Sequence, residues 1–225
     1  GLKLVETQSL NHNLPVVEIY GCLPWASGAI SRGYRDREFA NISTRHVKVI
    51  FPATSTVTSL QYMFYNCNSL QSIDMSGWDT ANWAVTSLQC MFSGCNSLQS
   101  VDMSGWDTAN WAVTGLQYMF YNCNSLQSVD MSGWDTANWA VTSLQYMFSG
   151  CNSLQALKFG ANTTWPALST QVDSTSKLRH NSIVAFFGAL PIVAAATTLT
   201  LGVTNLARVS DAEKMIATNK GWTLA

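Results

Sequence analysis

The sequence predicts an α/β solenoid with a parallel ladder of short strands on one side and short helices on the other. Three observations lead to this prediction. The unit that spans residues 59–86 is repeated almost verbatim, in copies that begin at Ser59, Ser87, Gly115 and Ser143. Each copy joins apolar residues at helical spacing to a short alternating segment, and its turn contains glycine. A fixed period of this size is typical of chains whose units bury their apolar sides against one another.

Composition and charge restrict the classes of function. Hydrophobic residues make up 47% of the 225-residue chain, and charged residues only 11%. The net charge of −1 is unevenly distributed, because residues 59–142 contain six aspartates and no Lys, Arg, Glu or His. Such an acidic array would repel phosphates, so we expect no nucleic-acid partner. No apolar run reaches the roughly 18 residues of a membrane-spanning helix, so we expect no membrane span in this chain.

Residues 1–58 are expected to cap the N-terminal end of the stack. Residues 14–20 are compatible with a short strand. Residues 45–51 alternate and are rich in β-branched side chains, as in a half-buried strand, and Pro52 follows them. We expect residues 45–51 to form the first strand of the ladder.

The repeats occupy residues 59–158, and we number the four copies units 1 to 4. In unit 1, residues 60–67 place apolar side chains at intervals of three and four, which predicts a helix of about two turns. Residues 70–75 follow, and their last positions alternate as in a strand, with Asp74 on the outward side. Gly77 and Asp79 then predict a turn.

Residues 159–225 are expected to hold degenerate repeats and a C-terminal cap. Residues 181–190 resemble the helical part of the unit, and residues 197–201 resemble its strand. Ser210 and Glu213 have the spacing of a capping box, which predicts a helix that ends near residue 218. The last four residues predict a final strand.

The string M-F-x-x-C-x-S-L-x-S-[IV]-D-M-S-G-W-D-T begins at Met63, Met91 and Met119. It resembles the leucine-rich repeat of BspA-like bacterial surface proteins, a type found in many surface lipoproteins. Unit 4 departs from the string after its first half, where Lys158 replaces the aspartate. The C-terminal end is similar to those of leucine-rich repeat proteins from gut bacteria and their prophages. The resemblance implies a leucine-rich repeat solenoid at a cell surface.

We therefore expect a non-enzymatic adhesion module, extracellular or on the cell surface, that binds a host or cell-surface protein or glycan. No catalytic motif surrounds the three histidines, which all lie outside the repeats, and we expect no catalytic residues and no cofactor. Two alternatives remain open. One is a receptor-binding or decoration module of a phage or prophage tail, which would be part of the virion. The other is a structural spacer whose repeats set only its length.

The expected binding surface is the outward side of the strands, because it forms a continuous and regularly spaced platform. Its candidate residues are Gln71, Ser72, Asp74 and Ser76 in unit 1, Gln99, Ser100, Asp102 and Ser104 in unit 2, and Gln127, Ser128, Asp130 and Ser132 in unit 3. The first aspartates of each unit would stack as like charges, which is unfavourable. Solvation and hydrogen bonds would offset this repulsion, or else a bound Ca²⁺ would. The second aspartates, beginning with Asp79, are expected to hold turns.

Further columns are expected inside the stack. Four cysteines recur at the same position of the four units, namely Cys67, Cys95, Cys123 and Cys151. We favour small buried thiols, although a strand spacing of about 5 Å would also permit disulfides. Zinc-ligand spacings are absent, so we expect no metal. Cys90 replaces a tyrosine and is expected to be exposed or half-buried. We expect at least one of the tryptophan columns that start at Trp78 and Trp83 to be core, and the tyrosines near Tyr62 to face solvent.

Overall fold

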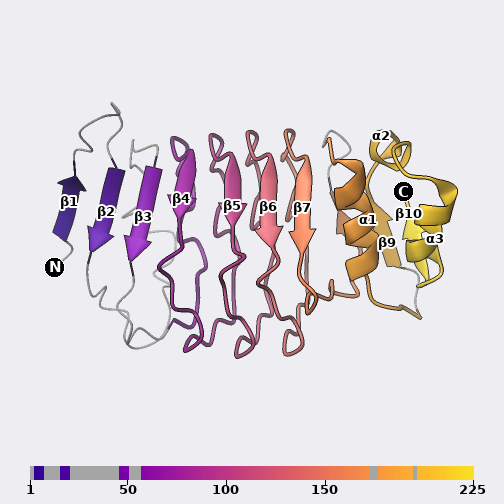
Figure 1. The fold of residues 1–225 in the computed structure, drawn as a ribbon, viewed down its shortest axis with the longest axis horizontal. Helices are drawn as coiled ribbons and strands as arrows, with labels where there is room; N and C mark the ends of the chain where they lie inside the picture. Colours follow the sequence, from indigo (N-terminus) through magenta and orange to yellow (C-terminus); the bar gives the residue numbers. More distant parts are fainter. Residues whose placement is uncertain (1–2, 8–15, 21–45, 51–56, 173–176, 195–196) are drawn as a thin grey trace.

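The computed structural model describes residues 3–7, 16–20, 46–50, 57–172, 177–194 and 197–225. It is a mixed α/β structure, with short helices and short, mostly parallel strands in small sheets (Figure 1). The elements in chain order are β1 (Lys3–Thr7), β2 (Val16–Tyr20), β3 (His46–Ile50), β4 (Ser72–Asp74), β5 (Ser100–Asp102), β6 (Ser128–Met131), β7 (Ala156–Phe159), β8 (Thr170–Gln171), α1 (His180–Ala189), β9 (Thr197–Thr200), α2 (Val203–Leu206), α3 (Asp211–Thr218) and β10 (Trp222–Leu224).

The described strands form three sheets. The first contains β1 to β4 in chain order, and only β1 and β2 are antiparallel in it. The second contains β5, β6 and β7, and the third β8, β9 and β10, all parallel. The strands predicted at residues 14–20 and 45–51 are confirmed as β2 and β3, and β3 pairs with the strand of unit 1 as expected. Strand β1 was not predicted.

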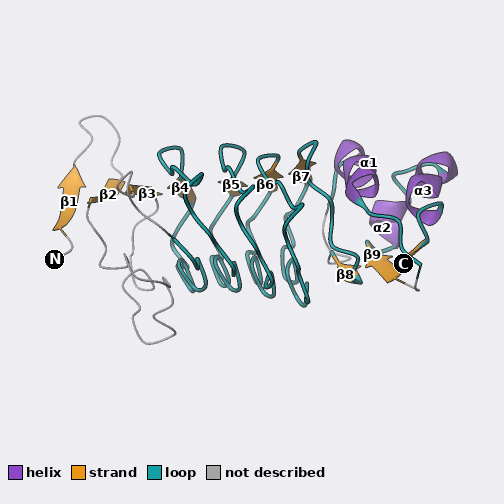
Figure 2. Ribbon diagram, turned by 90° about the horizontal axis from the view of Figure 1, so that it is seen from below, coloured by secondary structure: helices purple, strands orange, loops and turns teal. Residues whose placement is uncertain are grey.

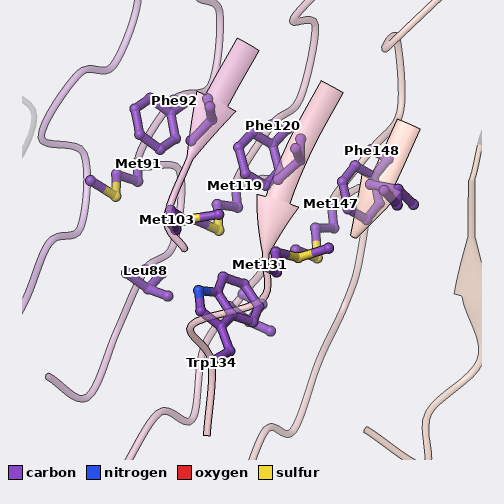
Figure 3. Packing of buried hydrophobic residues seen from close by; sticks show 14 of the residues in the cluster. Leu88, Met91, Phe92, Met103, Met119, Phe120, Met131, Trp134, Met147 and Phe148 are labelled. Atoms are coloured by element: carbon purple, nitrogen blue, oxygen red, sulfur yellow. The ribbon is translucent and has the colours of Figure 1, made fainter. Parts of the chain in front are cut away.

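The units lie side by side with equivalent residues in register. Ser100 of β5 faces Ser128 of β6, which faces Ala156 of β7. Outside the strands, the chain of each unit follows the same path as its neighbour (Figure 2). The core is consequently built from columns of identical side chains. The rings of Phe92 and Phe120 stack 5.6 Å apart at an interplanar angle of 4°, and Phe148 continues the column (Figure 3).

The helix predicted for residues 60–67 is wrong, although its apolar side chains are buried as expected. The segment is a series of turns in which Tyr62 and Asn66 adopt left-handed backbone angles, with φ of 60° and 57°. Alternate amides point to the next unit, and Phe64 N–H donates to the carbonyl of Met91 at 2.8 Å. An α-helix would direct these amides four residues back along the chain. The stacked neighbour offers acceptors in register, and the backbone uses those instead.

The C-terminal predictions agree with the structure. The helix predicted at residues 181–190 is α1, and Ser182 Oγ on it accepts a hydrogen bond from the backbone of β7. The capping box of α3 is formed, because Ser210 and Glu213 each accept from the backbone amide of the other. The strands predicted at residues 197–201 and at the C-terminus are β9 and β10, whereas α2 was not predicted. None of the described helices is long and apolar enough to cross a bilayer.

Candidate functional site

The predicted binding residues share one surface, which we call the strand face. In β5, Ser100 and Asp102 are exposed on either side of the buried Val101, because successive side chains of a strand point in opposite directions. The exposed members of the predicted set are Asp74, Ser76, Gln99, Ser100, Asp102, Ser104, Gln127 and Ser132, and the half-buried members are Gln71, Ser72, Ser128 and Asp130.

A column of five charged residues crosses the strand face. Strand pairing aligns Lys48 of β3 with Asp74 of β4, and it aligns Asp102, Asp130 and Lys158 of β5, β6 and β7. Asp74 and Asp102 occupy the same position of units 1 and 2, on strands that belong to different sheets. Lys48 Nζ lies 3.0 Å from a carboxylate oxygen of Asp74, and Lys158 Nζ lies 2.8 Å from one of Asp130. The two outer aspartates are therefore compensated by lysines, and Asp102 stands between them without an adjacent lysine in the column.

Sequence reasoning missed both lysines as part of the site. Lys158 occupies the position in unit 4 that Asp130 occupies in unit 3, so aligning the two units would have found it. Lys48 precedes the repeats and is out of phase with their period. His46 was missed for the same reason, and its Nδ1 makes a hydrogen bond of 2.6 Å with Ser72 Oγ.

The aspartates of the column also accept hydrogen bonds from the serine two residues later. The Ser76 hydroxyl donates to Asp74 at 2.6 Å and its amide at 2.9 Å. These two bonds, together with Lys48, lower the pKa of Asp74 to about 2. Partial burial raises the pKa of Asp130, but hydrogen bonds from Lys158 and Ser132 outweigh burial and leave it lowered. Both carboxylates are thus held in the charged form.

The second aspartates of units 2 and 3 have a different role. Asp107 Oδ1 accepts the amide hydrogen of Ala109, and Asp135 Oδ1 accepts that of Ala137, at 3.2 and 3.0 Å. Bonds from a side chain to the amide two residues ahead close turns. Asp107 and Asp135 hold turns, as expected, whereas Asp79 makes no such bond within the described part of the chain.

The strand ladder is interrupted between β4 and β5. The amide of Gln99 donates to the carbonyl of Gln71 at 3.1 Å, but β4 and β5 do not pair beyond this point. At the next junction the amide of Met103 donates to the carbonyl of Asp130 at 2.9 Å, and β5 pairs with β6 along its whole length. Units 1 and 2 have therefore separated at the strand, although they remain joined by backbone hydrogen bonds along residues 60–66.

A cavity of about 400 Å³ lies at this interruption. It is lined by Ile73, Asp74, Met75 and Ser76 of unit 1 and by Asp102, Ser104, Gly105 and Trp106 of unit 2. The space around the turn glycines shows the same difference between the two junctions. A Cβ added to Gly133 would lie 2.6 Å from the carbonyl oxygens of Met103 and Ser104, whereas one added to Gly105 would meet no heavy atom of the described chain within 4 Å. The unit 3 turn therefore lies against unit 2 at Gly133, whereas the unit 2 turn is open at Gly105. Beyond Gly105 this turn does contact unit 1, because the amide of Asp107 donates to Thr80 Oγ1 at 2.7 Å.

The cysteine column consists of buried free thiols, as favoured. The Sγ–H of Cys95 donates to the carbonyl of Phe64, and that of Cys123 to the carbonyl of Phe92, each at 3.0 Å. Burial raises the pKa of Cys123 to about 12. The prediction for Cys90 is wrong, because this side chain is only 7% exposed. Cys90 lies beside Tyr62 of unit 1, and it stands at the position that is a tyrosine in the other units.

Both tryptophan columns contribute to the core. Trp78 and Trp106 stack 5.6 Å apart, Trp83 and Trp111 stack 6.3 Å apart, and all four are buried. The tyrosines are mostly half-buried, and Tyr146 is the most exposed of the large hydrophobic side chains in units 1 to 4, at 46%. The aromatic surface is smaller than expected.

Within the described parts of the chain, no group of three or more His, Cys, Asp or Glu side chains is placed to hold a metal ion. Three features therefore remain as functional candidates: the strand face, its charged column and the cavity between units 1 and 2.

Comparison with known proteins identifies a family for this region. The family model described as "Mycoplasma protein of unknown function, DUF285" matches residues 36–159. Comparison with curated proteins and with solved structures gave no match. The matched segment is more than half of the chain and contains β3 to β7, which carry the strand face. The chain belongs to the DUF285 family of Mycoplasma proteins of unknown function.

Proposed function

We propose that the repeats form a leucine-rich repeat solenoid of the BspA-like type, and that the protein is a non-enzymatic extracellular module that binds a protein or glycan. The DUF285 family is associated with BspA-like surface repeat proteins, which supports the surface location. The parallel, in-register stacking of units 2 to 4 supports a solenoid, because each unit contacts its sequence neighbours along the row.

The strand face is the observation that carries the binding proposal. Gln99, Ser100 and Gln127 are exposed, and their side chains make no hydrogen bond with the described part of the chain. The fold does not need these polar groups for its own stability. They offer donors and acceptors at the strand spacing of about 4.8 Å, which suits the polar surface of a protein or a glycan.

Arrays of immobilised glycans and of extracellular-matrix proteins test this proposal. We expect the purified chain to bind a subset of spots, and the variant Ser100→Arg/Gln127→Arg to lose that binding, because two bulky side chains then stand on the platform. The matched control is Ala112→Arg/Ala140→Arg, which places the same charges on exposed positions of units 2 and 3 outside the strands.

The control variant should bind the same spots as the unmodified chain. Equal loss in both variants would show that added positive charge, rather than the strand face, decides binding. Equal retention in both, or the absence of any bound spot, would favour a structural spacer over a binding module.

A further inference from the structure

The cavity between units 1 and 2 is a feature that the repeat by itself does not create. Units 2 and 3 have almost the same sequence as units 1 and 2 around their strands, yet the β5–β6 junction is fully paired. The paired β5–β6 junction shows how two such units pack when no cavity separates them. At the open one, the strand–turn segments of residues 73–76 and 102–106 face each other across about 400 Å³. Binding sites for small groups commonly have volumes of about 300–1,000 Å³.

The charge at this cavity is not balanced. Asp74 on one wall is paired with Lys48, but Asp102 on the other wall has no lysine beside it in the column. Lys158 attracts Asp102 only at longer range, across the strand that carries Asp130. Asp102 is aligned with the carboxylate of Asp130 in the strand register, and it shares the cavity lining with that of Asp74, so like charges lie on both sides of it.

Hydrogen-bonding capacity is also left unused at Asp102. In units 1 and 3 the serine hydroxyl donates to the aspartate at 2.6 Å, as from Ser76 to Asp74. In unit 2 only the amide of Ser104 donates to Asp102, at 2.9 Å, and the Ser104 hydroxyl has no partner in the described residues. One carboxylate and one hydroxyl on the same wall are therefore available to a ligand.

Part of the remaining lining is apolar. Ile73 is half-buried, whereas its equivalents Val101 and Val129 are buried, so the opening uncovers part of an apolar side chain of unit 1. Met75 of unit 1 and Trp106 of unit 2 add further apolar side chains to the lining. Long basic side chains place an apolar stem along such surfaces and keep the charged head beside polar groups.

We propose that this cavity binds one lysine or arginine side chain of a partner protein, with its charged head at Asp102 and Ser104 and its stem against Ile73 and Met75. This inference rests on the proposed function, since it names the partner class for one part of the strand face. A single positive charge compensates Asp102 and leaves the five-residue column electrically neutral. A neutral glycan leaves that carboxylate uncompensated.

Nuclear magnetic resonance titration of the whole chain with short peptides tests the proposal. The probes are end-blocked Gly-Lys-Gly and Gly-Arg-Gly, with Gly-norleucine-Gly as the neutral analogue of equal length and methyl glucoside as a sugar. We expect the basic peptides to shift the backbone amide signals of Ser104, Gly105 and Trp106, and to leave those of Ser132 and Gly133 at the closed junction unchanged. The norleucine peptide and the glucoside should produce no such shifts.

Two variants assign the effect to the carboxylate. Asp102→Asn keeps the shape of the side chain and removes its charge, so it should weaken binding of the basic peptides by about tenfold or more. Asp107→Asn removes one charge from the turn of the same unit, outside the cavity lining, and should leave binding unchanged. Equal weakening in both variants, equal shifts with norleucine, or shifts with glucoside alone would overturn the proposal, and so would unchanged spectra with every probe.

The array experiment separates this inference from the proposed function. If array binding depends on Ser100 and Gln127 but Asp102→Asn binds as well as the unmodified chain, the cavity assignment is wrong and the strand-face proposal stands. If basic peptides bind at the cavity but the array signal does not depend on the strand face, the proposed function is wrong and the cavity assignment stands.

Discussion

Lys158 Nζ lies 2.8 Å from Asp130 Oδ2. Lys158 comes one repeat later in the sequence than Asp130 and lies on the adjacent parallel strand. Lys158 occupies the aspartate position of the repeat, so the fourth unit ends the column of like charges with an opposite charge. Lys48 does the same for Asp74 at the other end, from a strand outside the repeats. The change from aspartate to lysine in unit 4 therefore compensates the last negative charge of the column.

Replacing Lys158 by Gln should raise the pKa of Asp130 towards its ordinary value, because the largest favourable contact of its charged form is removed. The folded-state pKa of Asp130 is lowered, so this carboxylate stabilises the fold above its unfolded pKa of about 3.9 and that stability is lost as pH falls below it. Carbon-detected titration of the carboxyl groups measures the shift. The pKa of Asp74, paired with Lys48, serves as the control and should not change.

Replacing Phe92 by Ala should lower the free energy of unfolding by about 3–5 kcal/mol, since a fully buried ring is removed from the middle of the phenylalanine column. Urea denaturation followed by tryptophan fluorescence measures the change. Ser100→Ala, in the same unit but exposed, should change stability by less than about 0.5 kcal/mol. Similar losses in the two variants would contradict the stacked core.

Replacing Gly94 by Ala should destabilise the chain by about 1–2 kcal/mol, because Gly94 has a φ of 79°, which disfavours a residue with a Cβ. The added Cβ would also collide with the side chain of Asn66 in the unit before. Thermal unfolding measures the loss. Combining Gly94→Ala with Asn66→Gly should recover the part that comes from the collision.

The control for that experiment is Gly105→Ala, since Gly105 lies in open space at the cavity and does not require a positive φ. Its stability should remain close to that of the unmodified chain. A large loss at Gly105 would mean that residue 105 itself packs against unit 1, and that the cavity is closed.

The buried cysteines should resist alkylation in the folded protein. Cys123 is fully buried, its pKa is raised to about 12, and its Sγ–H is hydrogen-bonded to Phe92, so almost no thiolate is available at pH 8. Mass spectrometry after iodoacetamide treatment should find Cys67, Cys95, Cys123 and Cys151 unmodified in buffer and modified in urea. Oxidised cysteines in the unfolded sample would contradict the assignment of free thiols.

The sequence by itself determined which residues stack and which are buried. A strict repeat period places each side chain beside its own copy, so the burial of Phe64, Cys67 and at least one tryptophan column follows from spacing and polarity alone. The outward position of Asp74, Asp102 and Asp130 follows from strand alternation in the same way. The capping box of α3 was also predictable, because its partners lie only three residues apart.

Only the tertiary structure decided where the backbone hydrogen bonds go. The spacing of residues 60–67 is helical, but the carbonyls of the next unit lie within reach of Leu60, Phe64 and Asn66, so the segment forms turns instead. The opening between β4 and β5 is likewise invisible in a repeat whose units are nearly identical, because pairing depends on contacts between units and on the sheet to which each strand belongs. The spacing of apolar residues predicts which side of the chain is buried. It does not predict the hydrogen-bond partner of each amide or the charged neighbour of each carboxylate.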